Sequence, residues 1–254
     1  MAKKIMLRDL VAVQAGCSVA AAERKILAGE VFSGNARLTH PGEKFDSEIK
    51  LYIKENCPYV SRGAYKLLKA LEVFPLDVKN CVCIDAGSST GGFTQVLLQN
   101  GSSLVYAVDC GTNQLDFKLR SDSRVITMEN TRMQDLRKTD LQPLPKIAVM
   151  DVSFTSCMPL VYHLFAVLEI EEAVVLIKPQ FEYKRLQSVL KLSGNFGGVV
   201  QSEDEARKIL NYVCREIQNA GITLAAEPTE SPITGTYGNT EYLVYLQNIR
   251  RLSC

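Results

Sequence analysis

The chain has 254 residues, of which 46% are hydrophobic and 22% are charged, and its formal net charge at pH 7 is +1. This composition is typical of a soluble globular protein that is large enough to bury a core. The near-neutral balance neither predicts nor excludes nucleic-acid binding. Any RNA-binding surface must therefore come from the distribution of charge rather than from its total.

The cysteines and the apolar runs exclude two further classes of protein. No Cys-x-x-Cys pair occurs and only His40 and His163 can add imidazole ligands, so we expect no metal site. Apolar runs such as residues 173–177 are too short to cross a bilayer, and residues 1–10 lack the features of a signal peptide. We expect a cytoplasmic protein without stable membrane insertion, whose cysteines are small core hydrophobes in a reducing compartment.

Residues 1–55 carry short helical patterns followed by hairpin-like segments, which predict a small α+β domain. Apolar residues at helical spacing begin at Leu7, and a second helix is predicted over residues 20–27. Turn signals then precede a strand that alternates through Ile49, Leu51 and Ile53.

After a predicted linker at residues 56–60, helical and strand-like patterns alternate through a second domain at 61–254. Ser61 is predicted to cap a helix whose apolar stripe begins at Ala64. Strand-like runs then occur at residues 81–86, 104–109, 125–128, 147–151, 173–178, 222–226 and 242–246. This alternation predicts an α/β fold with a mostly parallel seven-stranded sheet and helices on both faces.

A glycine-rich turn follows the first of these strands. Gly87 permits a tight turn, while Gly91 and Gly92 let the backbone approach a ligand closely. About two dozen residues later the next strand ends in Asp109, whose carboxylate can accept both hydroxyls of a ribose. Because ligands of open parallel sheets bind at the carboxyl ends of the strands, the turn predicts a cofactor that contains a nucleoside.

The acidic residue before the turn selects the kind of cofactor. Dinucleotide folds prefer Gly-x-Gly-x-x-Gly, which offers a helix start to a pyrophosphate. Here Asp85 precedes the first glycine, and an anion suits a ligand with an ammonium and a sulfonium better than it suits a pyrophosphate. The sequence therefore favours S-adenosylmethionine over NAD. The predicted cofactor-binding residues are Asp85, Gly87, Ser89, Gly91, Gly92, Phe93 and Asp109.

Several stretches together carry a family resemblance: residues 59–67, 85–94, 106–109, 151–154, 177–181 and 238–243. From residue 59 onward the chain resembles the RrmJ/FtsJ-like ribose methyltransferases. The whole chain resembles the haemolysin-A or TlyA-type rRNA methyltransferases, which place an S-four-type RNA-binding domain before that fold. The resemblance implies a Rossmann-like class I methyltransferase domain that uses S-adenosylmethionine. It further implies ribosomal RNA or ribosomal subunits as partners, with the 2′-hydroxyl of a cytidine as acceptor.

The family's lysine–aspartate–lysine–glutamate set maps onto Lys66, Asp151, Lys178 and Glu241. A ribose hydroxyl is a poor nucleophile and needs a base, and a lysine can serve if its pKa is lowered. We expect Lys178 to take the proton and Asp151 to position it, while Lys66 and Glu241 orient the ribose. Amino-nitrogen methylases typically carry Asn/Asp-Pro-Pro-aromatic after the fourth strand, so the Asp-Val-Ser-Phe sequence at residues 151–154 favours an oxygen acceptor.

The match to the family leaves two points open. The acidic position that reads the adenine falls at Glu129 or Asn130, and the sequence does not decide between them. In the first domain the family's Ser-Arg pair is Ser18-Val19, which removes one phosphate contact. The remaining RNA-binding candidates, which are equally compatible with an ordinary solvated face, are Arg8, Arg24, Lys25, Arg37, Lys44 and Arg62.

Two alternative functions remain beside RNA methylation. One is a membrane-active haemolysin, as the family's historical name suggests, although no spanning or strongly amphipathic basic segment occurs. The other is a non-catalytic ribosome-assembly factor, which predicts loss of some of the four charged residues, whereas all four are present. The sequence leaves open the modified nucleotide, the ribosomal subunit and the oligomeric state.

Overall fold

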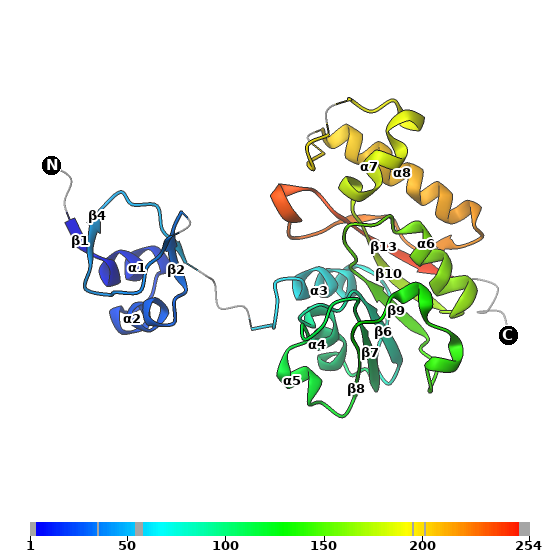
Figure 1. Cartoon of the computed structure of the whole chain (residues 1–254), viewed down its shortest axis with the longest axis horizontal. Coiled ribbons are helices and arrows are strands. Elements are labelled where there is room, and N and C mark those ends of the chain that lie inside the picture. The colour runs from blue at the N-terminus through cyan, green and yellow to red at the C-terminus, as the bar shows by residue number, and fades with distance from the viewer. Residues whose placement is uncertain (1–3, 35, 54–57, 195, 201, 249–254) are drawn as a thin grey trace. The chain divides into compact units, whose positions relative to one another are not determined.

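The computed structural model describes residues 4–34, 36–53, 58–194, 196–200 and 202–248. Contacts divide the chain into two compact units, Met1–Pro58 and Tyr59–Cys254 (Figure 1). Residues 56 and 57 of the predicted linker lie outside the described residues.

The first unit packs two helices beside short strands. Its elements are β1 (Lys4–Met6), α1 (Leu7–Ala15), α2 (Val19–Leu27), β2 (Val31–Ser33), β3 (Ala36–Arg37), β4 (Lys44–Asp46) and β5 (Tyr52–Ile53). Strand β1 pairs with β4, and β2 pairs with both β3 and β5, all antiparallel. The buried core is formed by Leu7, Val11, Ala22, Ile26, Val31 and Leu51.

The last strand of this unit is shorter than the alternation predicts, because only Tyr52–Ile53 pair with β2. A turn precedes it: the side chain of Asp46 accepts a hydrogen bond from the amide of Glu48 at 3.0 Å, and the amide of Ile49 donates to the Asp46 carbonyl. This Asx-type turn takes the backbone at Ile49 out of the ladder.

The second unit is built on one large sheet, and the predicted mostly parallel arrangement is confirmed. The strands lie in the order β11-β13-β10-β9-β6-β7-β8. Their bounds are β6 (Val82–Ala86), β7 (Leu104–Val108), β8 (Val125–Met128), β9 (Ile147–Met150), β10 (Glu172–Ile177), β11 (Thr223–Leu224) and β13 (Tyr242–Gln247). Strand β13 runs antiparallel to both neighbours, and an eighth short strand, β12 (Thr229–Glu230), pairs with it.

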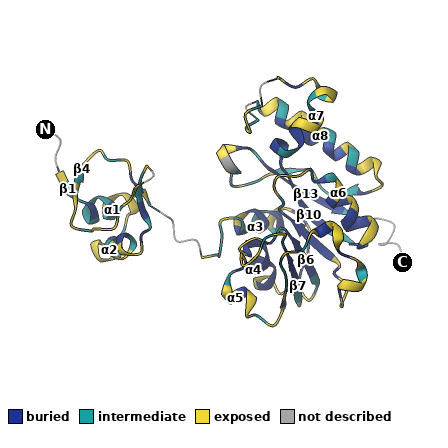
Figure 2. Cartoon of the chain, viewed as in Figure 1, coloured by how far each residue is buried: buried dark blue, intermediate teal, exposed yellow. Residues whose placement is uncertain are grey.

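Helices cover both faces of this sheet (Figure 1). The helical elements are α3 (Ala64–Val73), α4 (Gly92–Gln99), α5 (Phe117–Arg120), η1 (Met133–Asp135), η2 (Lys138–Asp140), α6 (Met158–Tyr162), η3 (His163–Val167), α7 (Pro179–Leu190), α8 (Glu203–Asn219) and η4 (Thr236–Gly238). Side chains alternate along each strand, so Cys83 packs with α3 and α4 whereas Ile84 packs with α6, α7 and α8. The strands are accordingly the most buried part of the unit (Figure 2).

Helix α3 does not begin as its sequence predicts. The residue before its first turn is Gly63, and Ser61 supplies only its carbonyl, which accepts from the amide of Ala64 at 3.3 Å. The hydroxyl of Ser61 lies instead against the start of α4, where a Cβ added to Gly92 would come within 2.3 Å of it. Ser61 therefore packs two helix starts together rather than capping one.

One edge of the sheet gathers residues from distant parts of the sequence. Strands β6, β9 and β10 are parallel, so their carboxyl ends lie at the same edge. Strand β13 runs the other way, and its first residue, Tyr242, pairs with Ile177, the last residue of β10. The residues just after β9 and β10 and just before β13 therefore meet.

Among the described residues, no helix is both long and apolar enough to span a membrane.

Candidate active site

A cleft of about 850 Å³ opens over this edge of the sheet. Its walls come from the segment before α3, the glycine turn after β6, and residues that follow β9 and β10 or precede β13. The volume lies toward the upper end of the ~300–1,000 Å³ typical of small-molecule sites. The cleft is therefore large enough for a drug-sized small molecule.

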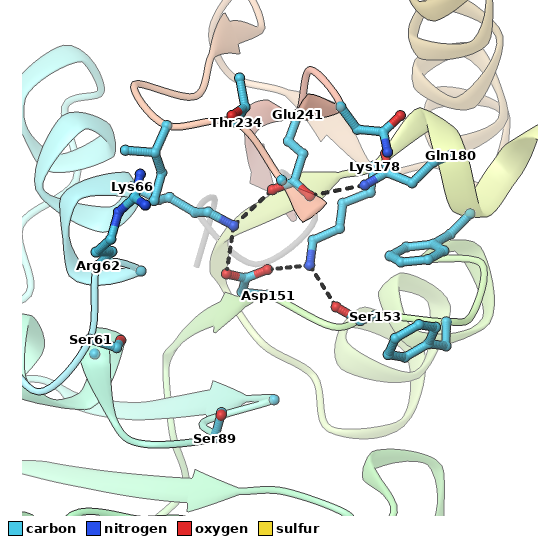
Figure 3. A pocket seen from close by; sticks show the side chains of 18 of the residues that line it. Ser61, Arg62, Lys66, Ser89, Asp151, Ser153, Lys178, Gln180, Thr234 and Glu241 are labelled. Atoms are coloured by element: carbon cyan, nitrogen blue, oxygen red, sulfur yellow. Dashed lines mark hydrogen bonds and ion pairs between the residues drawn. The ribbon is translucent and has the colours of Figure 1, made fainter. Parts of the chain in front are cut away.

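Four charged side chains lie at the base of this cleft in an alternating row (Figure 3). The Nζ atom of Lys66 lies 2.7 Å from Oε2 of Glu241 and 3.0 Å from Oδ2 of Asp151. The other carboxylate oxygen of Asp151 lies 2.6 Å from Nζ of Lys178. Lys178 also donates to the hydroxyl of Ser153 at 2.9 Å. All four residues of the predicted catalytic set therefore meet in one network.

The local sequence explains why Lys178 projects at the edge of the sheet. Pro179 is the first residue of α7, a position where a missing N–H is harmless and the fixed φ favours a helix. The residue before a proline is disfavoured in helical geometry, and Lys178 is accordingly extended, with φ of −114° and ψ of 98°. The strand thus ends, the lysine projects at the sheet edge, and the helix begins one residue later.

The network fixes the charge of two of its members at neutral pH. Burial by itself lowers the pKa of Lys66, but the carboxylates of Asp151 and Glu241 outweigh it and raise the pKa above its ordinary value. Burial favours the neutral form of Asp151, yet the ammonium groups of Lys178 and Lys66 hold its pKa below the ordinary value. Lys66 therefore stays protonated and Asp151 stays ionised.

The glycine turn forms the wall of the cleft beside this network. Of the predicted cofactor-binding residues in the turn, Gly87, Ser89, Gly92 and Phe93 line the cleft, whereas Gly91 does not. Gly87 has a φ of +85°, and a Cβ there would lie 2.8 Å from the carbonyl oxygen of Asp151. The turn and the chain just after β9, at Asp151, therefore touch through the glycine backbone.

Asp109 lies behind the turn rather than on the cleft wall. Its two carboxylate oxygens accept from the amides of Ser89 at 2.8 Å and Gly111 at 2.7 Å. An ionised carboxylate has about four acceptor sites, so these two bonds leave capacity for the hydroxyls of a ribose. The donors and acceptors present fit a nucleoside cofactor.

Asp85 is completely buried on the α4 side of the sheet and does not line the cleft. It accepts a 2.6 Å hydrogen bond from the hydroxyl of Thr94, while its second oxygen has no partner among the described residues. Burial raises its pKa to about 7, against the lowering effect of Thr94. Any influence on a cofactor must act through the turn above it.

Replacing Asp85 by asparagine should make stability less dependent on pH. The unfolded carboxyl titrates near 3.9, so between that pH and about 7 the folded state keeps a proton that the unfolded state loses, and stability falls as pH rises. Asp85→Asn removes this loss. Relative to wild type, its free energy of unfolding should gain about 3 kcal/mol between pH 5 and pH 8. Urea denaturation at both pH values measures it, and parallel pH curves for the two proteins would contradict it.

Neither candidate for adenine reading lines the cleft. The carboxylate of Glu129 accepts from the amides of Asn113, Gln114 and Leu115 at 2.9–3.1 Å and pairs with Arg120 at 2.8 Å. These hydrogen bonds, led by that from Leu115, lower its pKa to about 2. Glu129 therefore holds the loop after Asp109, and its role toward a cofactor stays a prediction, as does that of Asn130.

The structure also brings forward residues that the sequence interpretation did not single out. Ser153, Phe154, Gln180, Lys184 and Tyr237 all line the cleft. Phe154 is 91% exposed and Tyr237 is 84% exposed, and both have a positive φ, near 65° and 60°, which is uncommon outside glycine. The first three lie in stretches that carry the family resemblance, which was the available signal. Nothing in the local pattern distinguished Lys184 or Tyr237.

The predicted RNA-binding residues of the first unit differ in whether their side chains already have a partner within the protein. Arg8 pairs with Glu23 at 2.9 Å and Lys25 with Glu30 at 3.6 Å. Arg37 donates to the carbonyls of Gly29 and Ala28 at the end of α2. Arg24 and Lys44 have no partner among the described residues. In the second unit Arg62, also unpaired among the described residues, lines the cleft.

In the parts of the chain that the structure describes, no group of His, Cys, Asp and Glu side chains could hold a metal ion.

Comparison with solved structures finds a chain of similar fold. A protein from Streptococcus thermophilus with a provisional hemolysin name superposes with a TM-score of 0.71 at 39% identity. The superposition covers 97% of this chain and 89% of that chain.

Comparison of sequences assigns the family. YqxC of Bacillus subtilis, whose rRNA methyltransferase name is provisional, is 41% identical in an alignment 239 residues long that covers 89% of this chain and 79% of that protein. The 16S/23S rRNA (cytidine-2'-O)-methyltransferase TlyA of Mycobacterium tuberculosis is 37% identical over 190 residues, or 74% of this chain and 68% of the relative. A sequence model of the FtsJ-like methyltransferases matches residues 59–248, a segment within the second unit that carries the whole charged network. The chain therefore belongs to the FtsJ-like methyltransferase family.

Proposed function

We propose that this chain transfers a methyl group from S-adenosylmethionine to the 2′-hydroxyl of a ribose, in a cytidine of ribosomal RNA. The observation that carries the proposal is the alternating network of Lys66, Asp151, Lys178 and Glu241 beside the glycine turn. The nature of the substrate is supported by the relative from Mycobacterium tuberculosis, which is named for cytidine 2′-O-methylation of rRNA. Such a substrate places the reaction in the cytoplasm.

The residues of the turn would hold the cofactor, with Gly87, Ser89, Gly92 and Phe93 on the wall of the cleft and Asp109 behind them. When bound, S-adenosylmethionine supplies a methyl group attached to a positively charged sulfur, which makes the methyl carbon electrophilic. What remains for the protein is to orient the ribose hydroxyl and to accept its proton.

Lys178 is the group best placed to accept that proton at its Nζ atom, once it has released a proton of its own to solvent and entered the reaction as the neutral amine. Lys66 is bonded to two carboxylates, and its raised pKa keeps it protonated. Lys178 contacts one carboxylate and a neutral hydroxyl, so it is held by fewer anions than Lys66. Asp151 contacts both lysines and holds them apart at fixed positions. Lys66 is then a fixed cation that can donate to the ribose.

The rim of the cleft suits an unstacked nucleotide. The exposed rings of Phe154 and Tyr237 offer flat apolar surfaces, and bases extruded from RNA are commonly held by stacking on aromatic side chains. Arg62 and Lys184 also line the cleft and provide positive charge for phosphates.

The test is to incubate the purified protein and labelled S-adenosylmethionine with free rRNA, with separate ribosomal subunits and with assembled ribosomes in parallel, and then to map the label. We expect methylation of a cytidine 2′-oxygen. Label on a base nitrogen or carbon would contradict the assignment of the acceptor. Absence of label on free rRNA, on subunits and on assembled ribosomes would contradict the proposed function as a whole.

Arg24 and Lys44 are expected to contribute to RNA affinity because their side chains are exposed and have no partner among the residues that the structure describes. Alanine at either position should lower the slope of log K against log salt concentration by about 1, because one phosphate contact is lost. Fluorescence anisotropy with an rRNA fragment at several salt concentrations measures the slope. Lys118→Ala, at an exposed basic residue of α5, is the control. An equal effect in the control would show that only total charge matters.

A further inference from the structure

Gln180 is a buried neutral residue at one end of the charged network. Its Nε2 donates to Oε1 of Glu241 at 3.0 Å, while Lys66 donates to the other oxygen of the same carboxylate at 2.7 Å (Figure 3). Gln180 is 6% exposed and Glu241 is 2% exposed. Because an ionised carboxylate only accepts hydrogen bonds, the nitrogen of the amide must be the atom that faces it.

The other half of this amide is unsatisfied. The oxygen of Gln180 is buried and has no hydrogen-bond partner among the described residues. A buried acceptor without a partner destabilises the folded state, and an apolar side chain of similar length avoids that cost. The position of Gln180 is therefore explained by what its N–H does for Glu241 rather than by a contribution to folding.

The backbone closes a third side of the same carboxylate. A Cβ added to Gly235 would lie 2.2 Å from Oε1 of Glu241 and 3.3 Å from Nε2 of Gln180. The backbone at Gly235 thus lies directly against the carboxylate, where any side chain larger than that of glycine would collide with it. With Lys66 and Gln180 on its two oxygens, Glu241 is held from three directions and has little freedom to turn toward a substrate.

We propose that Gln180 is a positioning residue for methyl transfer, which acts through Glu241 to hold Lys66 in the place from which it orients the ribose. Contacts run without a break from Gln180 through Glu241, Lys66 and Asp151 to Lys178. The amide is neutral, so it adds no further charge to the network. This inference rests on the proposed function, since it concerns the same reaction.

The test replaces Gln180 by methionine, whose side chain has a similar length but no N–H group. Gln180→Met should lower kcat about tenfold, the effect of losing one hydrogen bond to a charged group. The KM for S-adenosylmethionine should change less than twofold, because Gln180 lies away from the glycine turn. The melting temperature should change little, because the lost hydrogen bond to buried Glu241 and the removal of the unpartnered oxygen act in opposite directions. Gln187→Met, on the same helix but outside the cleft, should behave as wild type in all three.

A double variant separates positioning from an independent role. If Gln180 acts through Glu241, adding Gln180→Met to Glu241→Ala should lower kcat no further. A further tenfold loss would overturn the inference, as would an unchanged kcat in the single variant or a melting temperature that falls in parallel with activity. Wild-type protein that methylates no RNA in this assay would contradict the proposed function itself. An active wild type with an equally active Gln180→Met would contradict only the inference.

Discussion

Replacing Lys178 by methionine is expected to lower kcat for methyl transfer by about 10²–10⁴-fold, the usual contribution of a general base. Its Nζ atom is held between Asp151 at 2.6 Å and Ser153 at 2.9 Å, at the base of the cleft. Methionine keeps the length of the side chain but cannot take a proton. The affinity for S-adenosylmethionine, measured by calorimetry, should change little because the lysine is not part of the glycine turn.

Single-turnover methylation with rRNA measures the chemical step for Lys178→Met. Lys208→Met is the matched control, since Lys208 is exposed on α8 and lies outside the cleft. If Lys178→Met kept a tenth or more of wild-type activity while Lys66→Met lost all of it, Lys66 would be the base. That result would conflict with the two carboxylates that raise the pKa of Lys66 and keep it protonated.

Alanine at Gly87 is expected to damage the cofactor site and the catalytic strand end together. The φ of +85° at this position is unfavourable for any residue with a Cβ, and such strain costs about 1–3 kcal/mol. The added Cβ would also lie 2.8 Å from the carbonyl oxygen of Asp151 and 3.2 Å from Cγ1 of Val152. Either the turn or the backbone of Asp151 must move.

We therefore expect Gly87→Ala to weaken S-adenosylmethionine binding about tenfold, because a turn that relaxes to relieve the strain must be forced back into the strained conformation to bind, and to reduce kcat as well. Calorimetric titration and thermal melting measure affinity and stability. Gly42→Ala is the control, since Gly42 has an ordinary φ and a Cβ there meets no described atom within 4 Å. Wild-type affinity in Gly87→Ala would show that the turn does not hold the cofactor.

Much of the fold follows from patterns that are local in sequence. The alternation of apolar strands with amphipathic helices predicts the sheet of the second unit, and strands such as β8 (Val125–Met128) begin and end where the pattern does. Errors fall where a side chain makes an alternative contact. Ser61 packs against the start of α4 instead of capping α3, and Asp46 forms a turn that shortens β5. Such contacts depend on neighbours that periodicity does not reveal.

The four charged residues of the network were available from family motifs, but their arrangement was not. Lys66 and Glu241 are separated by 175 positions, and their 2.7 Å contact exists only because an antiparallel strand returns to the edge where β10 ends. The environment of each side chain likewise could not be predicted from the motifs. Asp85 occupies a sequence position that predicts a cofactor ligand, yet it lies buried beneath the turn. Glu129 accepts hydrogen bonds from the amides of a loop.

The sequence by itself determined the fold class, the glycine turn that indicates a nucleoside cofactor, and the identities of the charged residues. Each of these depends only on short-range periodicity or on a contiguous motif. Only the tertiary structure decided which atoms meet. It paired Lys66 with two carboxylates, left Lys178 with one, and placed Gln180 and Gly235 around Glu241. Charge state, burial and hydrogen bonding are properties of a three-dimensional environment, and residues far apart in the chain create that environment only when the sheet has formed.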